Sequence, residues 1–204
     1  SNTYSYAVRS VGGGGENLTY SNIAYKLLYR LYKSTAKGGD QNYISLPYSF
    51  TITWDTAVNT AQALRRSIEG GTGTNNISSV NRWNQTTGAW QSAGAIGDFT
   101  LSAGEGYMVV MKVERWYALV GSYDRNIQLR LYKSSAKGGD LNYISLPYHF
   151  NIVFGTDINN AKALRCTIEG GTGTNNVTSV NRWNQSSGSW DSMGAIGKNF
   201  ALIP

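Results

Sequence analysis

Apolar positions alternate and cluster along this chain in a way that predicts mainly strands. β-branched, leucine and tyrosine residues gather at residues 27–33 and 42–48, on either side of a polar Lys-Gly-Gly-Asp turn. This pattern is typical of a β-hairpin. Residues 80–83 and 89–92 flank an Asn-Gln-Thr-Thr-Gly turn and predict a second hairpin.

One helix interrupts the predicted strands, and two more strands follow it. Residues 56–69 carry apolar residues at helical spacing, and two glycines follow them as a typical helix end. The apolar face of this helix comprises Val58, Ala61, Leu64 and Ile68. Further along the chain, the apolar runs 107–113 and 116–120 come after a Gly-Glu-Gly turn and predict two strands.

The sequence repeats itself after 100 residues. Residues 30–97 align without a gap to residues 130–197, and only 20 of these 68 positions differ. A period of this size indicates a duplicated domain rather than a short solenoid repeat. We therefore expect a mainly β fold with two tandem, β-sandwich-like modules, each containing one short helix, and an extended arm at the N-terminus.

The second copy lacks a counterpart of the last two predicted strands. We expect an arm at residues 1–26, a first module at 27–122, and a second module at 123–204 that is missing these strands. A β-module without its closing strands exposes unpaired backbone N–H and C=O groups and an apolar groove. Another segment is therefore expected to fill the groove.

The N-terminal arm is the candidate for that segment, because Tyr6-Ala7-Val8 resembles Tyr117-Ala118-Leu119 in the last strand of the first module. Three readings stay open. The arm completes the second module of a neighbouring copy, which produces a head-to-tail filament; it folds back onto its own second module; or the chain is a fragment of a longer array. The predicted donor residues are Tyr4, Tyr6, Val8 and Val11, and the predicted acceptor groove contains Phe200, Leu202 and Ile203.

Composition narrows the function classes. The formal charge is +6, but lysine and arginine are spread along the chain rather than gathered in a stripe, which disfavours nucleic-acid binding. No apolar run is long enough to span a bilayer. The chain has one histidine and one cysteine, His149 and Cys166, and the first copy has Ser49 and Arg66 at those places. We therefore predict a protein that is not an enzyme and carries no cofactor or metal.

Two further groups of residues bear on function. Asn-x-Ser/Thr triplets, which favour export and are candidate glycosylation sites, occur at Asn17, Asn76, Asn84, Asn176 and Asn184. Tryptophans recur at equivalent places in both copies, either as core residues or as platforms that stack on sugar rings. These are Trp83, Trp90, Trp183 and Trp190.

The run Ile-Ser-Leu-Pro-Tyr, a short helix, Ser-Val-Asn-Arg-Trp, a second tryptophan and Gly-Glu-Gly-Tyr resembles a β-rich module repeated in bacterial extracellular and cell-surface proteins. The layout, with a detached terminal strand, is similar to that of donor-strand pilus and fibril subunits. This resemblance implies a structural, extracellular role. We predict a subunit of an extracellular filament whose partners are copies of itself, with covalent glycans as a further expectation. The alternative is a carbohydrate-binding or adhesive module of a larger surface protein.

Overall fold

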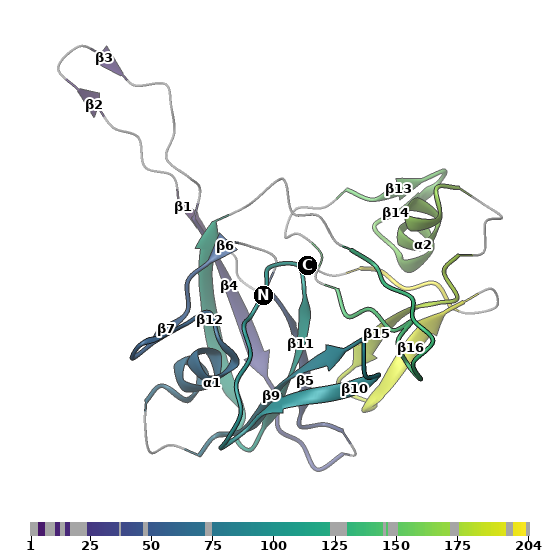
Figure 1. Cartoon of the computed structure of the whole chain (residues 1–204). Coiled ribbons are helices and arrows are strands. Elements are labelled where there is room, and N and C mark those ends of the chain that lie inside the picture. Colours follow the sequence, from purple (N-terminus) through teal and green to yellow (C-terminus); the bar gives the residue numbers. More distant parts are fainter. Residues whose placement is uncertain are drawn as a thin grey trace. The chain divides into compact units, whose positions relative to one another are not determined.

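A computed structural model describes most of the chain, and it is mainly β, as predicted (Figure 1). The described residues are 4–6, 11–12, 15–16, 24–36, 38–46, 49–71, 75–122, 130–144, 146, 151–171, 176–194 and 198–202. They form two compact units. Unit 1 comprises residues 1–35 and 40–145, and unit 2 comprises residues 36–39 and 146–204. Unit 1 thus includes residues 123–145, which the sequence repeat assigns to the second module.

The described residues of unit 1 form two four-stranded sheets, two small two-stranded sheets and one helix. Its elements are β1 (Tyr4–Tyr6), β2 (Val11–Gly12), β3 (Gly15–Glu16), β4 (Ala24–Leu31), β5 (Gln41–Ser45), β6 (Ser49–Phe50), β7 (Thr53–Trp54), β8 (Ala57–Val58), α1 (Ala61–Glu69), β9 (Ile77–Asn84), β10 (Ala89–Ala93), β11 (Gly106–Met111) and β12 (Arg115–Ser122). The strand orders are β1-β4-β12-β6 in one sheet and β10-β9-β11-β5 in the other, and all pairs are antiparallel.

The core of unit 1 is built from alternate residues of these strands. On β12, Tyr117 and Leu119 are buried while Trp116 and Val120 are exposed, which is the period of two that a strand imposes. The hydroxyl of Tyr29 on β4 donates to the carbonyl of Ser45 on β5 and so links the two sheets. Burial raises the pKa of Tyr29 far above its ordinary value, because the phenolate would lose its hydration there.

The predicted hairpin of residues 27–33 and 42–48 is wrong. β4 pairs with β1 and β12, whereas β5 pairs with β11 in the other sheet. A side chain closes the connection between them: Asn42 accepts from the backbone N–H of Tyr32 at 2.7 Å and donates to its carbonyl at 3.0 Å. The turn is therefore real, but the strands on either side separate to different sheets.

The predicted helix begins five residues late, because residues 53–58 form the small hairpin of β7 and β8. Asn59 adopts a left-handed φ of 51°, and its side chain accepts from the N–H of Ile52 at 2.7 Å, which closes this hairpin. Thr60 then caps α1 by accepting from the N–H of Ala63. Val58 consequently lies outside the helix and is 51% exposed.

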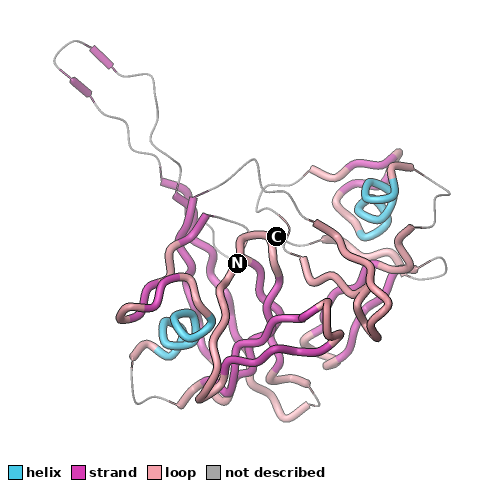
Figure 2. Tube along the Cα trace, in the orientation of Figure 1, coloured by secondary structure: helices cyan, strands magenta, loops and turns pink. Residues whose placement is uncertain are grey.

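Unit 2 has fewer paired strands. Its elements are β13 (Val153–Phe154), β14 (Asp157–Ile158), α2 (Ala161–Glu169), β15 (Val180–Asn184) and β16 (Ser189–Met193). They correspond in position to β7, β8, α1, β9 and β10, one repeat earlier. Each unit thus has one helix among its described residues, and Figure 2 shows both helices beside short strands. As in unit 1, the helix starts later than predicted, so that Ile158 lies on β14 and is 59% exposed.

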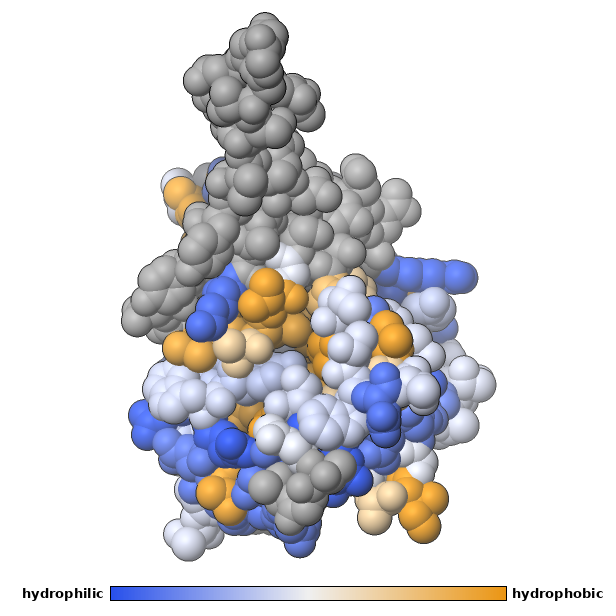
Figure 3. Space-filling model, turned by 90° about the vertical axis from the view of Figure 1, so that its left-hand side faces the viewer, coloured by the Kyte–Doolittle hydropathy of each residue, from blue (hydrophilic) through white to orange (hydrophobic). Residues whose placement is uncertain are grey.

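Exposed apolar residues are scattered over the face drawn in Figure 3, where several separate patches stand among polar ones. In unit 1, Trp116 and Val120 on β12 are more than half exposed. Their neighbours on β4 include Arg30, whose guanidinium lies over the Trp116 ring at 5.9 Å. Single exposed apolar residues of this kind are normal on a protein surface, so they do not by themselves mark a binding site.

Candidate functional site

In unit 1, β11 is the strand that completes the sheet next to the β9–β10 hairpin. It pairs with β9 on one side and with β5 on the other. It contributes the buried residues Tyr107, Val109 and Met111, none of which is more than 1% exposed. Because both of its edges are paired and one of its faces is fully buried, β11 is a central strand of this part of the core.

Tyr107 has the most specific contacts on β11. Its ring stacks on Phe99, with centroids 6.2 Å apart and an interplanar angle of 11°. Its hydroxyl accepts from the N–H of Ser102 at 2.7 Å and donates to Glu105 at 2.8 Å. Burial is the main reason why the pKa of Tyr107 lies far above its ordinary value. The guanidinium of Arg82 lies 4.8 Å from the centroid of the Phe99 ring.

Unit 2 has the corresponding hairpin without a third strand among the residues that the structure describes. β15 pairs with β16 in the same register as β9 with β10, so that Trp183 lies opposite Trp190 as Trp83 lies opposite Trp90. The other edge of β15 has no strand ladder in the described part of unit 2.

Compared with β9, which pairs with β11, β15 is shorter and its residues are more exposed. β9 starts at Ile77 and β15 only at Val180, because residues 177–179 have no ladder to join. Val80 is fully buried and Val180 only partly, while Asn81 is 3% exposed and Asn181 falls in the exposed class. The edge of β15 therefore presents backbone groups and partly exposed apolar side chains, which is the composition of a strand-acceptor site.

Two of the three predicted acceptor residues lie close to this edge. Phe200 is buried in a cluster with Ala161 and Met193, against which Val180 and Leu202 also pack. Ile203 lies outside the described residues. The predicted groove residues Phe200 and Leu202 therefore belong to the same apolar cluster of unit 2 as Val180 of β15.

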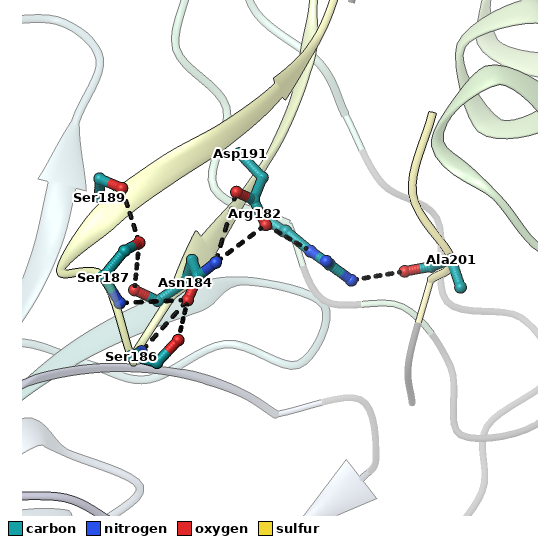
Figure 4. Close-up of polar contacts among 7 residues, drawn as sticks. All are labelled: Arg182, Asn184, Ser186, Ser187, Ser189, Asp191 and Ala201. Carbon is teal, nitrogen blue, oxygen red and sulfur yellow. Dashed lines mark hydrogen bonds and ion pairs between the residues drawn. The ribbon is translucent and has the colours of Figure 1, made fainter. Parts of the chain in front are cut away.

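Arg182 connects β15 to the segment that contains Phe200. It donates to Asp191 on β16 and to the carbonyl of Ala201, as Figure 4 shows. Its guanidinium lies 4.8 Å from the centroid of the Phe200 ring, the same distance as between Arg82 and Phe99. Phe200 thus has the arginine neighbour of its unit 1 counterpart, but the described residues of unit 2 include no counterpart of Tyr107.

The predicted donor residues belong to unit 1. β1 forms three residue pairs with β4, among them Tyr4 with Lys26 and Tyr6 with Ala24. Val11 lies on β2, opposite Glu16 on β3, and Val8 lies outside the described residues. Within one chain, the first part of the arm is therefore an edge strand of the sheet that contains β4.

The asparagines of the two hairpin turns act as turn residues. The side-chain oxygen of Asn84 accepts from the N–H groups of Thr86 and Thr87, and that of Asn184 from Ser186 and Ser187 (Figure 4). The Asn184 amide group also donates to Asp191 at 3.4 Å. Of the other candidate glycosylation sites, Asn76 is partly buried, Asn176 is exposed, and Asn17 lies outside the described residues.

Trp83 and Trp183 each pack on a glycine of a Lys-Gly-Gly-Asp turn. In unit 1, the indole N–H of Trp83 donates to the carbonyl of Gly138 at 3.0 Å. A Cβ atom on Gly138 would lie 2.7 Å from the Trp83 ring, and one on Gly38 would lie 3.1 Å from the Trp183 ring, so both turns need glycine. Sequence reasoning missed this role, although both glycines are present in both copies.

The remaining tryptophans differ between the units. Trp90 packs edge-on against Trp83 and lies beside Tyr143, with ring centroids 5.3 and 4.8 Å apart. Trp190 packs against Trp183 at the same 5.3 Å and is 40% exposed. Of the four predicted sugar-stacking residues, Trp190 therefore presents the most open ring.

The two residues that could suggest chemistry, Cys166 and His149, are the single cysteine and the single histidine of the sequence. Cys166 is buried on α2, and His149 lies outside the described residues. Among the described residues, no three His, Cys, Asp or Glu side chains gather as metal ligands would. No helix in the described part of the chain is both long and apolar enough to cross a membrane.

No family model, no curated protein and no solved structure matches this chain. The resemblance to a repeated cell-surface module therefore stays a prediction, and the functional argument depends on the geometry of the site.

Proposed function

We propose that this protein is a structural subunit of an extracellular filament, in which the N-terminal arm of one copy completes the sheet of unit 2 in the next copy. The observation that carries the proposal is the edge of β15, which has no strand ladder in the described residues, whereas the equivalent edge of β9 pairs with β11. An added strand would supply both the backbone hydrogen bonds and the apolar side chains that β11 supplies in unit 1.

The energetic terms favour strand addition. Each net backbone hydrogen bond contributes about 0.5–1.5 kcal/mol, and each buried Val- or Tyr-sized side chain about 1.5–3 kcal/mol before ordering costs are subtracted. A strand that buries two such side chains and forms several hydrogen bonds therefore offsets a large part of the association cost, which is about 4–15 kcal/mol. The β15 edge is also partly apolar, which favours pairing over exposure to water.

The direction of assembly follows from where the two surfaces lie. β1 belongs to unit 1 and β15 to unit 2, so the donor and acceptor surfaces of one chain are different. A contact between unlike surfaces is heterologous and, unless its rotation closes a ring, it continues without limit as a filament. The Asn-x-Ser/Thr triplets support an exported protein and offer sites for glycans on the finished fibre.

A carbohydrate-binding module is the second candidate, and Trp190 is the observation that favours it. The ring is 40% exposed at the end of a hairpin, where an aromatic face can stack on a sugar. If this reading holds, Trp190→Ala removes binding on a glycan array while Trp116→Ala, at another exposed tryptophan (59% exposed), leaves it unchanged. Binding unaffected by Trp190→Ala would contradict it.

Electron microscopy and sedimentation of the full chain test the filament. We expect fibres from the full chain and single particles from a variant that lacks residues 1–14. Because the truncated chain can also misfold, Val8→Asp provides a second test, with Ser10→Asp as its control for the added charge. Single particles from the full chain at every concentration, or fibres that persist in both the truncated and the Val8→Asp variants, would contradict the proposal.

A further inference from the structure

We propose that the donated strand takes the place of β11, antiparallel to β15, with Tyr6 in the position of Tyr107 and Val8 in the position of Val109. This inference rests on the proposed function and specifies its contact. It differs from the expectation drawn from the sequence, in which Tyr6-Ala7-Val8 corresponds to Tyr117-Ala118-Leu119 on β12.

Among the described residues, nothing in unit 2 or in the second copy provides a partner for a strand in the β12 position. In unit 1, β12 pairs along its whole length with β4, and Leu31 at the end of β4 is 1% exposed. The counterpart of β4 in the second copy is residues 124–131. Of these, the described residues 130 and 131 are not in a strand, and Leu131 is 40% exposed. A strand in the β12 position would find no β4-like partner in the described part of the chain.

The place of β11, by contrast, is bordered by a formed hairpin. β15 and β16 already pair over five residues in the register of β9 and β10. In unit 1, β11 pairs with β9 so that Met108 lies opposite Asn81 and Val109 opposite Val80. One repeat later these partners are Asn181 and Val180, which set Ala7 opposite Asn181 and Val8 opposite Val180.

The side chains of the arm fit this place. Tyr6-Ala7-Val8 has the Tyr-x-Val pattern of Tyr107-Met108-Val109. In a strand at the β11 position, Tyr6 and Val8 would therefore lie on the face that Tyr107 and Val109 turn to the core of unit 1. Phe200 has the Arg182 guanidinium at 4.8 Å but, in the described residues, no tyrosine stacked on it as Tyr107 stacks on Phe99. Tyr6 would supply that ring, and Val8 would cover the partly exposed Val180.

Donation in this register requires an exchange of partners. Within one chain, Tyr6 pairs with Ala24 through the three-residue ladder of β1 and β4. The new ladder along β15 is at least as long and adds the burial of Tyr6 and Val8 in unit 2. Donation therefore replaces the three-residue ladder with β4 by the ladder along β15, and until then β4 pairs with the donor strand of a free subunit.

Cysteine cross-linking tests the register. In a Cys166→Ala background, the pair Ala7→Cys with Asn181→Cys places the two Cβ atoms across an antiparallel ladder, within reach of a disulfide. The pair Ala7→Cys with Gln128→Cys tests the β12 position instead, because Gln128 is one repeat after Leu28, which lies opposite Ala118. Each single-cysteine variant serves as a control.

We expect oxidation of the first pair to give a ladder of covalent multimers on a denaturing gel. The amount of cross-linked product should be at least tenfold greater than for the second pair or for the single-cysteine variants. Fibres that form normally while the second pair cross-links, or while neither pair does, would overturn the β11 register but leave the filament intact. A chain that forms neither fibres nor cross-links overturns both. Tyr6→Ala gives a second measurement: we expect assembly to need at least a tenfold higher concentration, whereas Tyr4→Ala should change it less.

Discussion

The two helices of this protein have similar sequences and equivalent caps, and the apolar residues of their first turns are buried in both, yet their apolar faces differ in burial near the C-terminal end. Ile68 on α1 is 3% exposed and Ile168 on α2 is 37% exposed. Both helices end in a left-handed glycine, Gly70 or Gly170, with φ of 74° and 73°. Local structure is therefore set by local sequence, whereas burial depends on strands that unit 1 contains and unit 2 lacks among its described residues.

The hairpins teach the same lesson. β9 and β15 differ little in sequence and pair identically with their partners, but β9 is three residues longer because β11 extends its ladder. The difference indicates that β11 extends the β9 ladder and buries Val80 and Asn81, whose counterparts in unit 2 are more exposed. It also identifies the contact that unit 2 must obtain elsewhere to reach the same packing.

Removal of Tyr107 should have the largest effect. Tyr107→Ala deletes a fully buried ring and two hydrogen bonds, and we expect it to lower the free energy of unfolding of unit 1 by about 3–5 kcal/mol. Urea denaturation followed by tryptophan fluorescence measures this loss. Tyr132→Ala is the matched control at a 45% exposed tyrosine. Equal losses at the two positions would contradict the account of β11.

Truncation of the helix isoleucines should separate the two units directly. We expect Ile68→Ala to cost about 2–5 kcal/mol, as is usual for a core aliphatic residue, and Ile168→Ala to cost about 1 kcal/mol or less, because the side chain is already partly in water. Thermal unfolding of both variants gives the comparison. A loss at Ile168 as large as that at Ile68 would show that the two side chains are equally well packed and would contradict the comparison.

The helix caps should behave alike in both units. Thr60 and Asn160 accept from the backbone N–H of Ala63 and Ala163 at 3.2 and 2.8 Å. We expect Thr60→Ala and Asn160→Ala each to cost about 1 kcal/mol, with losses that agree within a few tenths. Denaturation curves of the two variants check this. A strong difference would mean that the caps also depend on the sheets.

Alkaline pH should destabilise unit 1 more than unit 2. At pH 10.5 we expect this effect to be the smallest of the predicted effects. Burial raises the pKa of Tyr29, Tyr107 and Tyr117 in unit 1, whereas Tyr148 is the single tyrosine of unit 2. These groups stay protonated in the folded state but ionise near pH 10 when unfolded, so their contribution is complete below that pH and declines above it. Residue-specific exchange rates at pH 9 and 10.5 measure the difference. Equal losses in both units would contradict it.

Sequence reasoning succeeded where pairing is local. The hairpin of residues 80–83 and 89–92 and the strands at 107–113 and 116–120 were predictable from alternation and turn residues, and so was the end of α1 at Gly70. The early start predicted for the helix failed because the left-handed Asn59 closes a small hairpin that periodicity does not reveal.

The pairing of strands that are far apart in the sequence could not be predicted from the pattern of apolar residues. Nothing in residues 27–33 and 42–48 distinguishes a hairpin from two strands of different sheets, because that choice depends on β11 and β12, more than sixty residues further along the chain. The groove residues Phe200 and Leu202 could be proposed from the alignment of the copies. The β15 edge needed the structure, since only the comparison with β9 shows which ladder unit 2 lacks among the described residues.

Amide hydrogen exchange along residues 177–184 tests the central claim most directly. The chain that lacks residues 1–14 is mixed with a synthetic peptide of residues 1–14, and with the same peptide carrying Val8→Asp as a control. The account predicts that the unmodified peptide slows exchange at β15 at least tenfold and saturably, while the control peptide does not. Exchange at β15 that is the same with and without the unmodified peptide would contradict the claim that this edge accepts a strand from another copy.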